Sequence, residues 1–377
     1  MKVIFKIFAG ALICLTANAL EFNEYGHRSM AMGGVGVAMQ HNPYAVFYNP
    51  ALTSSNENAR FGYGLGGDFY EKNILDVFDY KLDNIQDIAA FNGLLENNYV
   101  SAKIKGAWAL KAPKLFPYGN FGIGFAQSIY VASNFIGSVP TGQTSIGNSV
   151  RFNIRRVDIM EIPLSYAFSV DTLAGQLSWG TAVKLMNLFN SQTSRLLLTT
   201  DNRTSIKDDI QKTLKGSNAD LASNVGLDVG FAYTPIHIPG FTLGVVGKNL
   251  NTPKFDFKNG KLTLHPQARL GIAYDFYEYF TIASDIDLSE NSMLSPYGEP
   301  QQKSQKLGLG LETHNLFVDT RWGIARDLRQ DNGAILSFGM GVGLLEFGLA
   351  VGTKEVKVKD KRYPRYFAIQ LGGNFEF

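Results

Sequence analysis

The feature that most constrains this chain is a two-residue alternation of apolar with small or polar residues. It is clearest in YFAIQLGGNFEF (366–377), where Phe367, Ile369 and Leu371 alternate with Ala368 and Gln370. Such alternation places the two sets on opposite faces of an extended strand. About 10 residues in a tilted strand cross a bilayer. The stretch therefore favours a membrane-spanning strand, with the last half-buried strand of a soluble sandwich as the alternative.

The same period recurs along most of the chain. Fourteen segments carry it, an even number, as a closed barrel with both chain ends on one side requires. They are 60–69, 99–110, 119–131, 157–169, 176–189, 224–233, 241–249, 266–276, 279–288, 304–312, 316–325, 334–342, 345–353 and 366–377.

The connections between these segments alternate between long and short. The first is long (71–98), the second short (111–118), the third long (132–156), and this order continues to the end. Outer-membrane barrels have short periplasmic turns and longer external loops, whereas a soluble sandwich has no reason to sort its loops in this way. The sequence therefore predicts an all-β fold, a transmembrane antiparallel β-barrel of about 14 strands.

Both ends of the chain favour the same location. Residues 1–19 combine Lys2 and Lys6 with an apolar run and an Ala-Asn-Ala ending at Ala19, the pattern of a secretory signal peptide. No apolar run long enough for a membrane helix follows it. We expect cleavage near Ala19, insertion into a bacterial outer membrane, and recognition of Phe377 as an assembly signal by the barrel-assembly machinery.

Residues 20–58 do not alternate and are predicted to form an N-terminal plug, or hatch, inside a barrel of residues 59–377. The proposed plug motif joins glycines, which allow tight turns and close backbone approach, to an Asn-Pro step. It comprises Gly26, Gly33, Gly34, Gly36, Asn49 and Pro50. The glycine spacing only weakly resembles a phosphate-binding loop, because no strand precedes it and no P-loop lysine follows.

Composition excludes several classes of function. The signal peptide contains Cys14, the single cysteine, so the mature chain has no thiol and no disulfide. Signal removal takes Lys2 and Lys6 from 35 basic residues, and 35 − 2 = 33 equals the 33 acidic residues. A neutral chain gives no electrostatic reason to expect a nucleic acid partner.

Charged residues of the strands fall on the small-residue face, which is predicted to line the lumen. Two interpretations stay open, a structural ion-pair network and a polar lining that guides a solute. These lumen charges are Asp228, Arg269, Asp275, Asp285, Asp287, Asp319 and Arg321, with Glu312 and Glu346 beside them. Pro163 interrupts one strand, where it predicts either a bulge or a lateral gap in the wall.

Three external loops carry further signals. Ile206, Ile210 and Leu214 recur with helical spacing in 203–215, and 71–98 has similar stretches. Such helices either cap the barrel or bind a partner. The loop 354–365, KEVKVKDKRYPR, has six cations against two acids. It is either a solvated loop or a contact for outer-membrane lipid and lipopolysaccharide.

Catalytic patterns are absent from the sequence. The mature chain has five histidines (His27, His41, His237, His265 and His314) but no H-E-x-x-H, G-x-S-x-G or paired-histidine metal spacing. We therefore expect no enzyme activity, no cofactor and no metal.

Three stretches carry a family resemblance. GHRSMAMGGVGVA (26–38), followed by Asn49-Pro50-Ala51, resembles the N-terminal hatch of FadL-like outer-membrane proteins. GKNLNTPKF (247–255) and HPQARLGIAY (265–274) are similar to the branch of conjugal-transfer TraF-like proteins. The resemblance implies a fourteen-stranded barrel with a plug that passes hydrophobic, fatty-acid-like molecules sideways out of its lumen.

The TraF name admits a second function. A better-known TraF of conjugation systems is a periplasmic thioredoxin-like protein, whose chemistry this chain lacks the cysteines to perform. Two hypotheses follow. Either the chain passively takes up a hydrophobic ligand across the outer membrane, or it is a non-enzymatic barrel that holds a partner in conjugal transfer or secretion.

Overall fold

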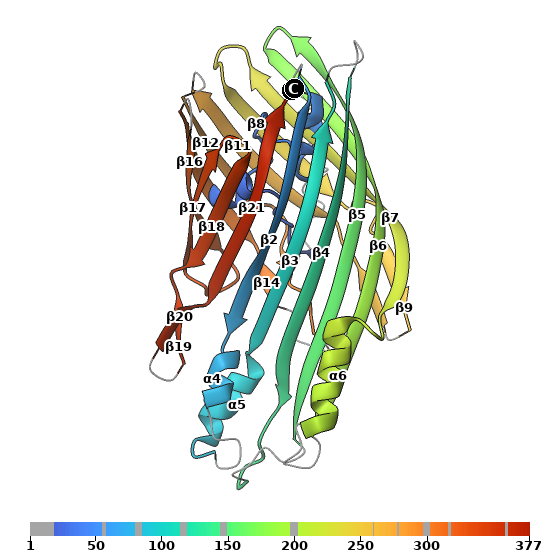
Figure 1. Ribbon diagram of the computed structural model, residues 1–377, viewed down its shortest axis with the longest axis vertical. Helices are drawn as coiled ribbons and strands as arrows, with labels where there is room; N and C mark the ends of the chain where they lie inside the picture. The colour runs from blue at the N-terminus through green and yellow to red at the C-terminus, as the bar shows by residue number, and fades with distance from the viewer. Residues whose placement is uncertain are drawn as a thin grey trace.

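The main element of the computed structural model is a closed barrel of fourteen strands, each antiparallel to its neighbours (Figure 1). The structure describes residues 19–54, 58–79, 85–113, 119–143, 149–196, 203–258, 260–276, 279–296, 302–315, 318–358 and 361–377. Residues 1–18 of the predicted signal peptide lie outside these ranges.

The wall strands correspond one to one with the fourteen predicted segments, so the predicted fold class is confirmed. They are β2 (Arg60–Lys72), β3 (Tyr99–Lys111), β4 (Asn120–Gly137), β5 (Val150–Thr172), β6 (Gly175–Leu196), β7 (Asp220–Pro235), β8 (Phe241–Lys248), β11 (Gln267–Phe276), β12 (Phe280–Asp287), β15 (Lys306–His314), β16 (Asp319–Asp327), β17 (Ala334–Val342), β18 (Leu345–Gly352) and β21 (Tyr366–Glu376).

The barrel closes where β21 pairs with β2. Their register runs without a break from Arg60 opposite Glu376 to Tyr70 opposite Tyr366. One residue further, the backbones of Ala59 and Phe377 exchange two hydrogen bonds of 3.0 Å each. No strand edge is left open at this seam, which is what a barrel in a membrane requires.

The two faces of the wall differ as the alternation predicts. On β21, Leu371 is 58% exposed on the outside, whereas Gln370 beside it is 3% exposed on the inside. Large apolar side chains are exposed in the same way around the outside of the barrel. An apolar exterior of this extent is typical of a lipid-facing wall and exceeds what soluble monomers expose.

The wall is much taller on one side than on the other. β5 has 23 residues and β6 has 22, whereas β8, β12 and β18 have 8 each. The short connections lie at the end where the chain terminates, and the long ones lie at the opposite end (Figure 1). We call the latter the loop end.

Helices α4 (Ile74–Asp79), α5 (Ile88–Glu96) and α6 (Arg203–Lys215) occupy two of the long connections. They do not cap the barrel mouth, as one interpretation of the sequence held. α5 packs Phe91 and Leu95 against Phe135 of β4, and Thr213 of α6 contacts Thr193 of β6 at 2.7 Å. Phe135 and Thr193 lie on the outward face of their strands, so these helices cover the outside of the tall wall.

The N-terminal segment, residues 20–54, lies inside the ring of strands. It contains β1 (Ala19–Leu20), α2 (His27–Ala31), α3 (Ala45–Tyr48) and the 3-10 helix η2 (Pro50–Ser54). Its residues are almost all buried and meet wall glycines closely. A Cβ added to Gly308 of β15 would lie 2.2 Å from the carbonyl oxygen of Gly33, and one added to Gly244 of β8 would lie 2.3 Å from that of Val37.

Parts of the long connections also fold inward. β1 pairs with β13 (Asn291–Ser292), which pairs with β14 (Lys303–Ser304).

Two hairpins join β9 (Lys254–Phe257) to β10 (Gly260–Thr263) and β19 (Glu355–Val358) to β20 (Lys361–Pro364). Among the described residues, no helix is both long and apolar enough to cross a membrane.

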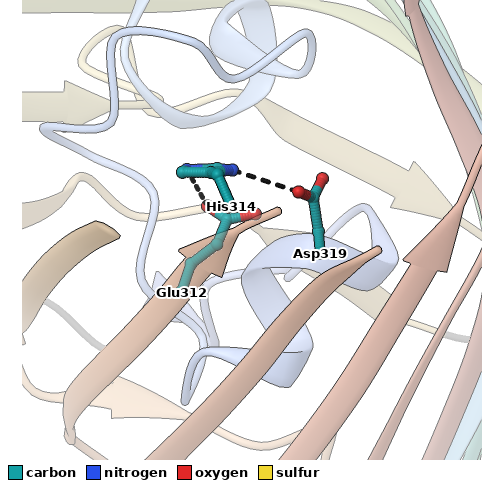
Figure 2. A group of neighbouring side chains, drawn as sticks. All are labelled: Glu312, His314 and Asp319. Carbon is teal, nitrogen blue, oxygen red and sulfur yellow. Dashed lines mark hydrogen bonds and ion pairs between the residues drawn. The ribbon is translucent and has the colours of Figure 1, made fainter. Parts of the chain in front are cut away.

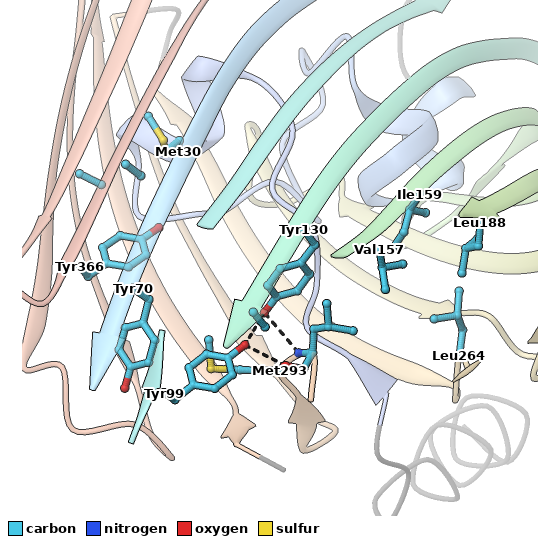
Figure 3. Packing of buried hydrophobic residues seen from close by; sticks show 14 of the residues in the cluster. Met30, Tyr70, Tyr99, Tyr130, Val157, Ile159, Leu188, Leu264, Met293 and Tyr366 are labelled. Carbon is cyan, nitrogen blue, oxygen red and sulfur yellow. Dashed lines mark hydrogen bonds between the residues drawn. The ribbon is translucent and has the colours of Figure 1, made fainter. Parts of the chain in front are cut away.

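A buried apolar cluster fills the lumen toward the loop end (Figure 3). Wall tyrosines Tyr99 and Tyr130 meet Met293 and Leu294, which come from the connection between β12 and β15. The Tyr99 hydroxyl donates to the Leu294 carbonyl oxygen at 3.0 Å, and the Tyr130 hydroxyl donates to Glu21 at 2.7 Å. The cluster thus joins the wall, an external connection and the N-terminal segment.

Candidate functional site

The plug-motif glycines shape the backbone on both sides of α2, Gly26 before it and the others after it. Gly26, Gly33 and Gly34 have φ values of 88°, 74° and 83°, a region that favours glycine. Gly36 has no positive φ, but a Cβ there would lie 2.4 Å from the Tyr48 ring. The backbone N–H groups of Gly36 and Val37 both donate to Asp285 of β12, at 2.8 and 3.0 Å.

Asn49 and Pro50 attach the next part of the segment. The Asn49 side-chain amide donates to the carbonyl oxygens of Val37 (2.9 Å) and of Phe231 in β7 (3.0 Å), and its oxygen accepts from the Ala51 N–H at 3.1 Å. Pro50 is the first residue of η2, a position where its missing N–H costs no hydrogen bond. Asn49 therefore links two turns of the segment to the wall.

Helix α2 is fixed to the wall by a buried ion-pair network. The guanidinium of Arg28 donates to Glu312 of β15 through Nε at 2.8 Å. Arg321 of β16 donates to the other Glu312 oxygen at 2.6 Å and also pairs with Glu346 of β18. His27 Nε2 lies 2.9 Å from Glu346. Removing any one partner from such a buried network leaves another charge uncompensated, which strongly destabilises the fold.

The network borders a cavity of about 800 Å³ at the end of the barrel opposite the loop end. We call this cavity the vestibule. Its lining is mostly polar and includes Arg28, His41, Asp275, Asp319 and Glu376. Burial, together with the Arg60 and Arg28 charges, lowers the pKa of His41 to about 4, so this ring is neutral at physiological pH.

His314 lies in the vestibule between Glu312 and Asp319, the one group of possible metal ligands among the described residues (Figure 2). Asp319 faces Nδ1 at 3.2 Å, while Glu312 faces Nε2 at 3.7 Å. One ion can take only one ring nitrogen, and the Glu312 oxygens already accept from Arg28 and Arg321. His314 is therefore hydrogen-bonded to Asp319 and only near Glu312, and the three groups do not form one coordination sphere.

A second set of charges lies around the N-terminal segment nearer the loop end. Arg269 donates to Asp287 at 2.6 Å, and Lys306 donates to Glu24 at 2.9 Å. Burial raises the pKa of the Glu24 carboxyl, but the ammonium groups of Lys306 and Lys105 outweigh it and hold that pKa at about 2. Glu24 is therefore ionised throughout the physiological range and pairs permanently with Lys306.

The predicted lumen charges thus fall into separate groups. Glu312, Asp319, Arg321, Glu346 and Asp275 gather at the vestibule, where Asp275 accepts from the Thr281 hydroxyl at 2.5 Å. Asp285 and Arg269 contact the N-terminal segment, and Asp287 pairs with Arg269. Asp228 stands apart and pairs with Lys184 of β6 at 3.0 Å.

Three cations that pair with these charges or with the N-terminal segment were missed from the sequence: Arg28, Lys184 and Lys306. The alternation placed Lys184 and Lys306 on inward-facing positions of their strands, which was a usable signal. Arg28 lies in a segment without periodicity, and nothing in its local sequence indicates that it meets Glu312.

The wall is incomplete at Pro163. β4 and β5 pair from Asn120 to Ile123 and again from Ala126 onward, but Gly124 and Phe125 have no partner opposite Pro163 and Ile162. The register is the same on both sides of the interruption, so the predicted bulge is absent. Behind it, a Cβ on Gly124 would lie 2.7 Å from the ring of Phe47 in α3.

Phe377, the predicted assembly signal, lies at the rim of the barrel. Its side chain is 71% exposed, and its backbone pairs with Ala59. The folded barrel therefore makes little use of this aromatic ring.

Solved structures place the fold in a known class. The toluene transporter TbuX of Ralstonia pickettii aligns with a TM-score of 0.55 at 15% identity, over 94% of this chain and 98% of that one. The toluene transporter TodX of P. putida gives 0.55 at 15% identity, over 94% and 99%. A Pseudomonas aeruginosa FadL homologue gives 0.52 at 12% identity, over 95% and 99%. The fold is that of the FadL-like barrels.

Within this class, the family model described as "F plasmid transfer operon, TraF, protein" matches residues 46–287, more than half of the chain. The chain belongs to this family, and the resemblance seen in the sequence is confirmed. No curated protein matches it.

Proposed function

We propose that the protein lies in a bacterial outer membrane, where it passes hydrophobic small molecules from the loop end into its lumen and releases them sideways through the wall beside Pro163. Three solved barrels of this fold are described as toluene transporters or as a FadL homologue. The apolar exterior and the sorted connections support the location. The ligand is proposed to be fatty-acid-like or similarly apolar, because the side chains that fill the lumen toward the loop end are largely apolar.

The observation that carries the proposal is the interruption between β4 and β5. Inside a membrane, unpaired backbone groups are tolerated only where protein covers them or where they line a cavity. Here the rings of Phe47 and Tyr25 pack behind the interruption, with ring centroids 4.8 Å apart. Release then requires Phe47 to move inward, since the wall already lacks hydrogen bonds at this position.

A cross-link can test the exit directly, because the mature chain has no cysteine. Phe125→Cys with Ile162→Cys would join β4 to β5 at the interruption. We expect oxidation to lower uptake of an apolar fluorescent probe by whole cells severalfold, and reduction to restore it. The matched control is Gln127→Cys with Met160→Cys, a regular pair two residues away on the same face. Equal uptake by both cross-linked proteins would contradict the lateral exit.

A second function is supported by the family and by the vestibule. Membership of a transfer-operon family favours a barrel that holds a component of conjugal transfer or secretion. A polar cavity of about 800 Å³ at the periplasmic end gives such a component a place to bind. A stoichiometric partner after mild-detergent purification, together with normal uptake by the oxidised F125C/I162C variant, would favour this function over transport.

A further inference from the structure

We infer that hydrophobic molecules enter the lumen from the outer leaflet of the membrane, through a second break in the wall between β7 and β8. The inference rests on the proposed transport function and names the entrance which that function requires. The break, here called the β7 window, is bordered by residues 220–228 of β7. The turn 249–253, which follows β8, closes it.

The β7 window exists because β8 is much shorter than β7. On one side, β7 pairs with β6 along all of its 16 residues. On the other side, it pairs with β8 only from Val229 to Tyr233. Among the described residues, no strand pairs with this second side of β7 between residues 220 and 228. The loop-end half of the β7 edge is therefore left for the turn to cover.

One side chain of the turn takes the place of the missing strand. The Asn251 amide donates to the carbonyl oxygen of Val225 at 2.6 Å, and its oxygen accepts from the N–H of Leu227 at 2.9 Å. The N–H of Leu250 donates to the carbonyl oxygen of Leu227 at 2.8 Å. A strand edge in lipid requires such partners, and asparagine offers a donor and an acceptor on one short side chain. Asn251 therefore closes the edge without a strand ladder.

The window opens at the depth of the lipid chains. Val225 of β7 and Leu185 of β6 form a register pair, and they are 41% and 57% exposed on the outward face. Leu250 lies on the same face, because a Cβ on the outward-facing Gly247 would lie 3.0 Å from its side chain. An apolar molecule dissolved in the lipid thus reaches the turn without crossing a polar surface.

Behind the turn lies the apolar cluster of the lumen. The hairpin of β9 and β10 is on the lumen side of β7, where the Asn224 side chain donates to the Lys254 carbonyl oxygen at 2.7 Å. Phe255 of β9 is fully buried in the cluster. Leu264, after β10, belongs to the same cluster as Leu188 of β6 (Figure 3). One turn of the chain therefore separates the lipid from the apolar interior.

The backbone of the turn is strained at two positions. Asn249 and Thr252 have φ values of 54° and 52°, a region that residues other than glycine rarely adopt, β-branched ones least of all. Asn249 is fixed, because its N–H donates to Asp228 at 2.8 Å and its side-chain oxygen accepts from Lys184 at 2.7 Å. Such strain is common in segments that switch between conformations. The window therefore opens beyond Asn249, by movement of residues 250–253.

A single thiol can block the window from the lipid side, because the mature chain has no cysteine. Leu250→Cys is labelled with a bulky, membrane-soluble maleimide, and uptake of N-phenyl-1-naphthylamine by whole cells is measured. We expect the label to lower the uptake rate severalfold, whereas unlabelled Leu250→Cys takes up the probe normally. The matched control is labelled Leu309→Cys, since Leu309 is 48% exposed on the lipid-facing side of β15 in the wall far from the window.

A looser turn should have the opposite effect. Asn251→Ala leaves the backbone groups of Val225 and Leu227 without their partners, so we expect the probe to enter severalfold faster. Asn224→Ala is the matched control, because it removes a side-chain hydrogen bond between β7 and the hairpin but leaves the strand edge covered. We expect unchanged uptake in this control. The labelling experiment does not depend on either substitution, so poor assembly of Asn251→Ala leaves the test intact.

Equal uptake by labelled Leu250→Cys and labelled Leu309→Cys would overturn the inference and favour entry from water at the loop end. Unchanged uptake by an Asn251→Ala barrel that assembles in normal amounts would also contradict it. Failure of the proposed function gives a different result. Cells with the unmodified protein would then take up the probe no faster than cells without it, a comparison made before any variant is tested.

Discussion

The tall and short halves of the barrel share one strand pattern but differ in the length of their strands. From β2 to β7 the strands have 13 to 23 residues, whereas from β8 to β21 they have 8 to 11. A tilted strand needs only about 9–11 residues to cross a membrane. The short half is therefore matched to lipid, and the excess of the tall half stands outside it.

The two halves also differ in what packs against the outer and inner faces of the wall. The tall half covers its excess from the outside, with α4, α5 and α6 on the outward face of the wall. Among the described residues, the short half has no helix on its outward face, and its inner face holds the buried network of Arg28, Glu312, Arg321 and Glu346. The inner face of the tall half holds buried ion pairs too, such as Lys184 with Asp228. We therefore expect the inner network to depend on its ion pairs, and the outer layer of the tall half to depend on apolar packing.

The largest expected effect comes from breaking the buried network. Arg321→Met leaves Glu312 and Glu346 without one of their cations in a buried site, which should cost about 3–5 kcal/mol. The exposed pair of Arg195 with Asp209 in the tall half is the control, and Arg195→Met should cost at most about 1 kcal/mol. Urea titrations of the refolded barrels in lipid vesicles measure both. Similar losses in the two variants would contradict the distinction between the inner network of the short half and the outer layer of the tall half.

A smaller effect is expected where the wall meets the backbone of the N-terminal segment. In Gly308→Ala of β15, the new methyl would lie 2.2 Å from the Gly33 carbonyl oxygen. We expect a loss of about 1–3 kcal/mol from overpacking. Gly64→Ala of β2 is the matched control, because its nearest neighbour is the hydroxyl of Tyr44 at 3.2 Å, the far end of a side chain. The same titrations apply, and a tolerated Gly308→Ala would show that the segment is loosely held.

The seam between the halves gives the third prediction. Phe377→Ala keeps the two backbone hydrogen bonds to Ala59 and removes only an exposed ring, so the inserted barrel should lose less than about 1 kcal/mol. If assembly machinery reads the terminal aromatic, the amount of inserted protein should nevertheless fall severalfold. Quantitative blots of the outer-membrane fraction, with urea titration of the inserted protein, separate the two effects. Normal insertion would refute the role of Phe377.

Much of the fold was predictable because lipid enforces the pattern. Every segment that faces lipid alternates, so all fourteen strands were found. The tall strands extend further than predicted, with β5 beginning at Val150 instead of 157 and β6 ending at Leu196 instead of 189. Above the membrane the outward residues no longer need to be apolar, as Arg156 and Arg195 illustrate. The alternation is lost there although the strand continues.

Less of the candidate site was predictable. The alternation identified which wall charges face inward, such as Asp285 and Arg321. It did not identify their partners, because the N-terminal segment has no period from which its docking against the wall follows. Asp285 accepts from two backbone N–H groups. Every residue except proline offers such a donor, so the sequence does not indicate where these contacts form. The interruption at Pro163 was indicated by one residue, but Phe47 behind it was not.

The smallest expected effect concerns the cationic loop 354–365, which forms the β19–β20 hairpin in the short half. Its charge is less available than the sequence predicts, because Lys354 pairs with Asp331 and Arg365 lies 3.6 Å from both Glu71 and Asp76.

The triple variant K357Q/K361Q/R362Q should therefore lower lipopolysaccharide retention by only about twofold at low salt. The difference should fade at high salt, since the screening length falls to about 3 Å at 1 M. Phosphate analysis of the variant and the unmodified barrel, purified in parallel, measures the retained lipopolysaccharide. Equal retention by the two proteins at low salt would show that the hairpin is a solvated loop without a lipid contact.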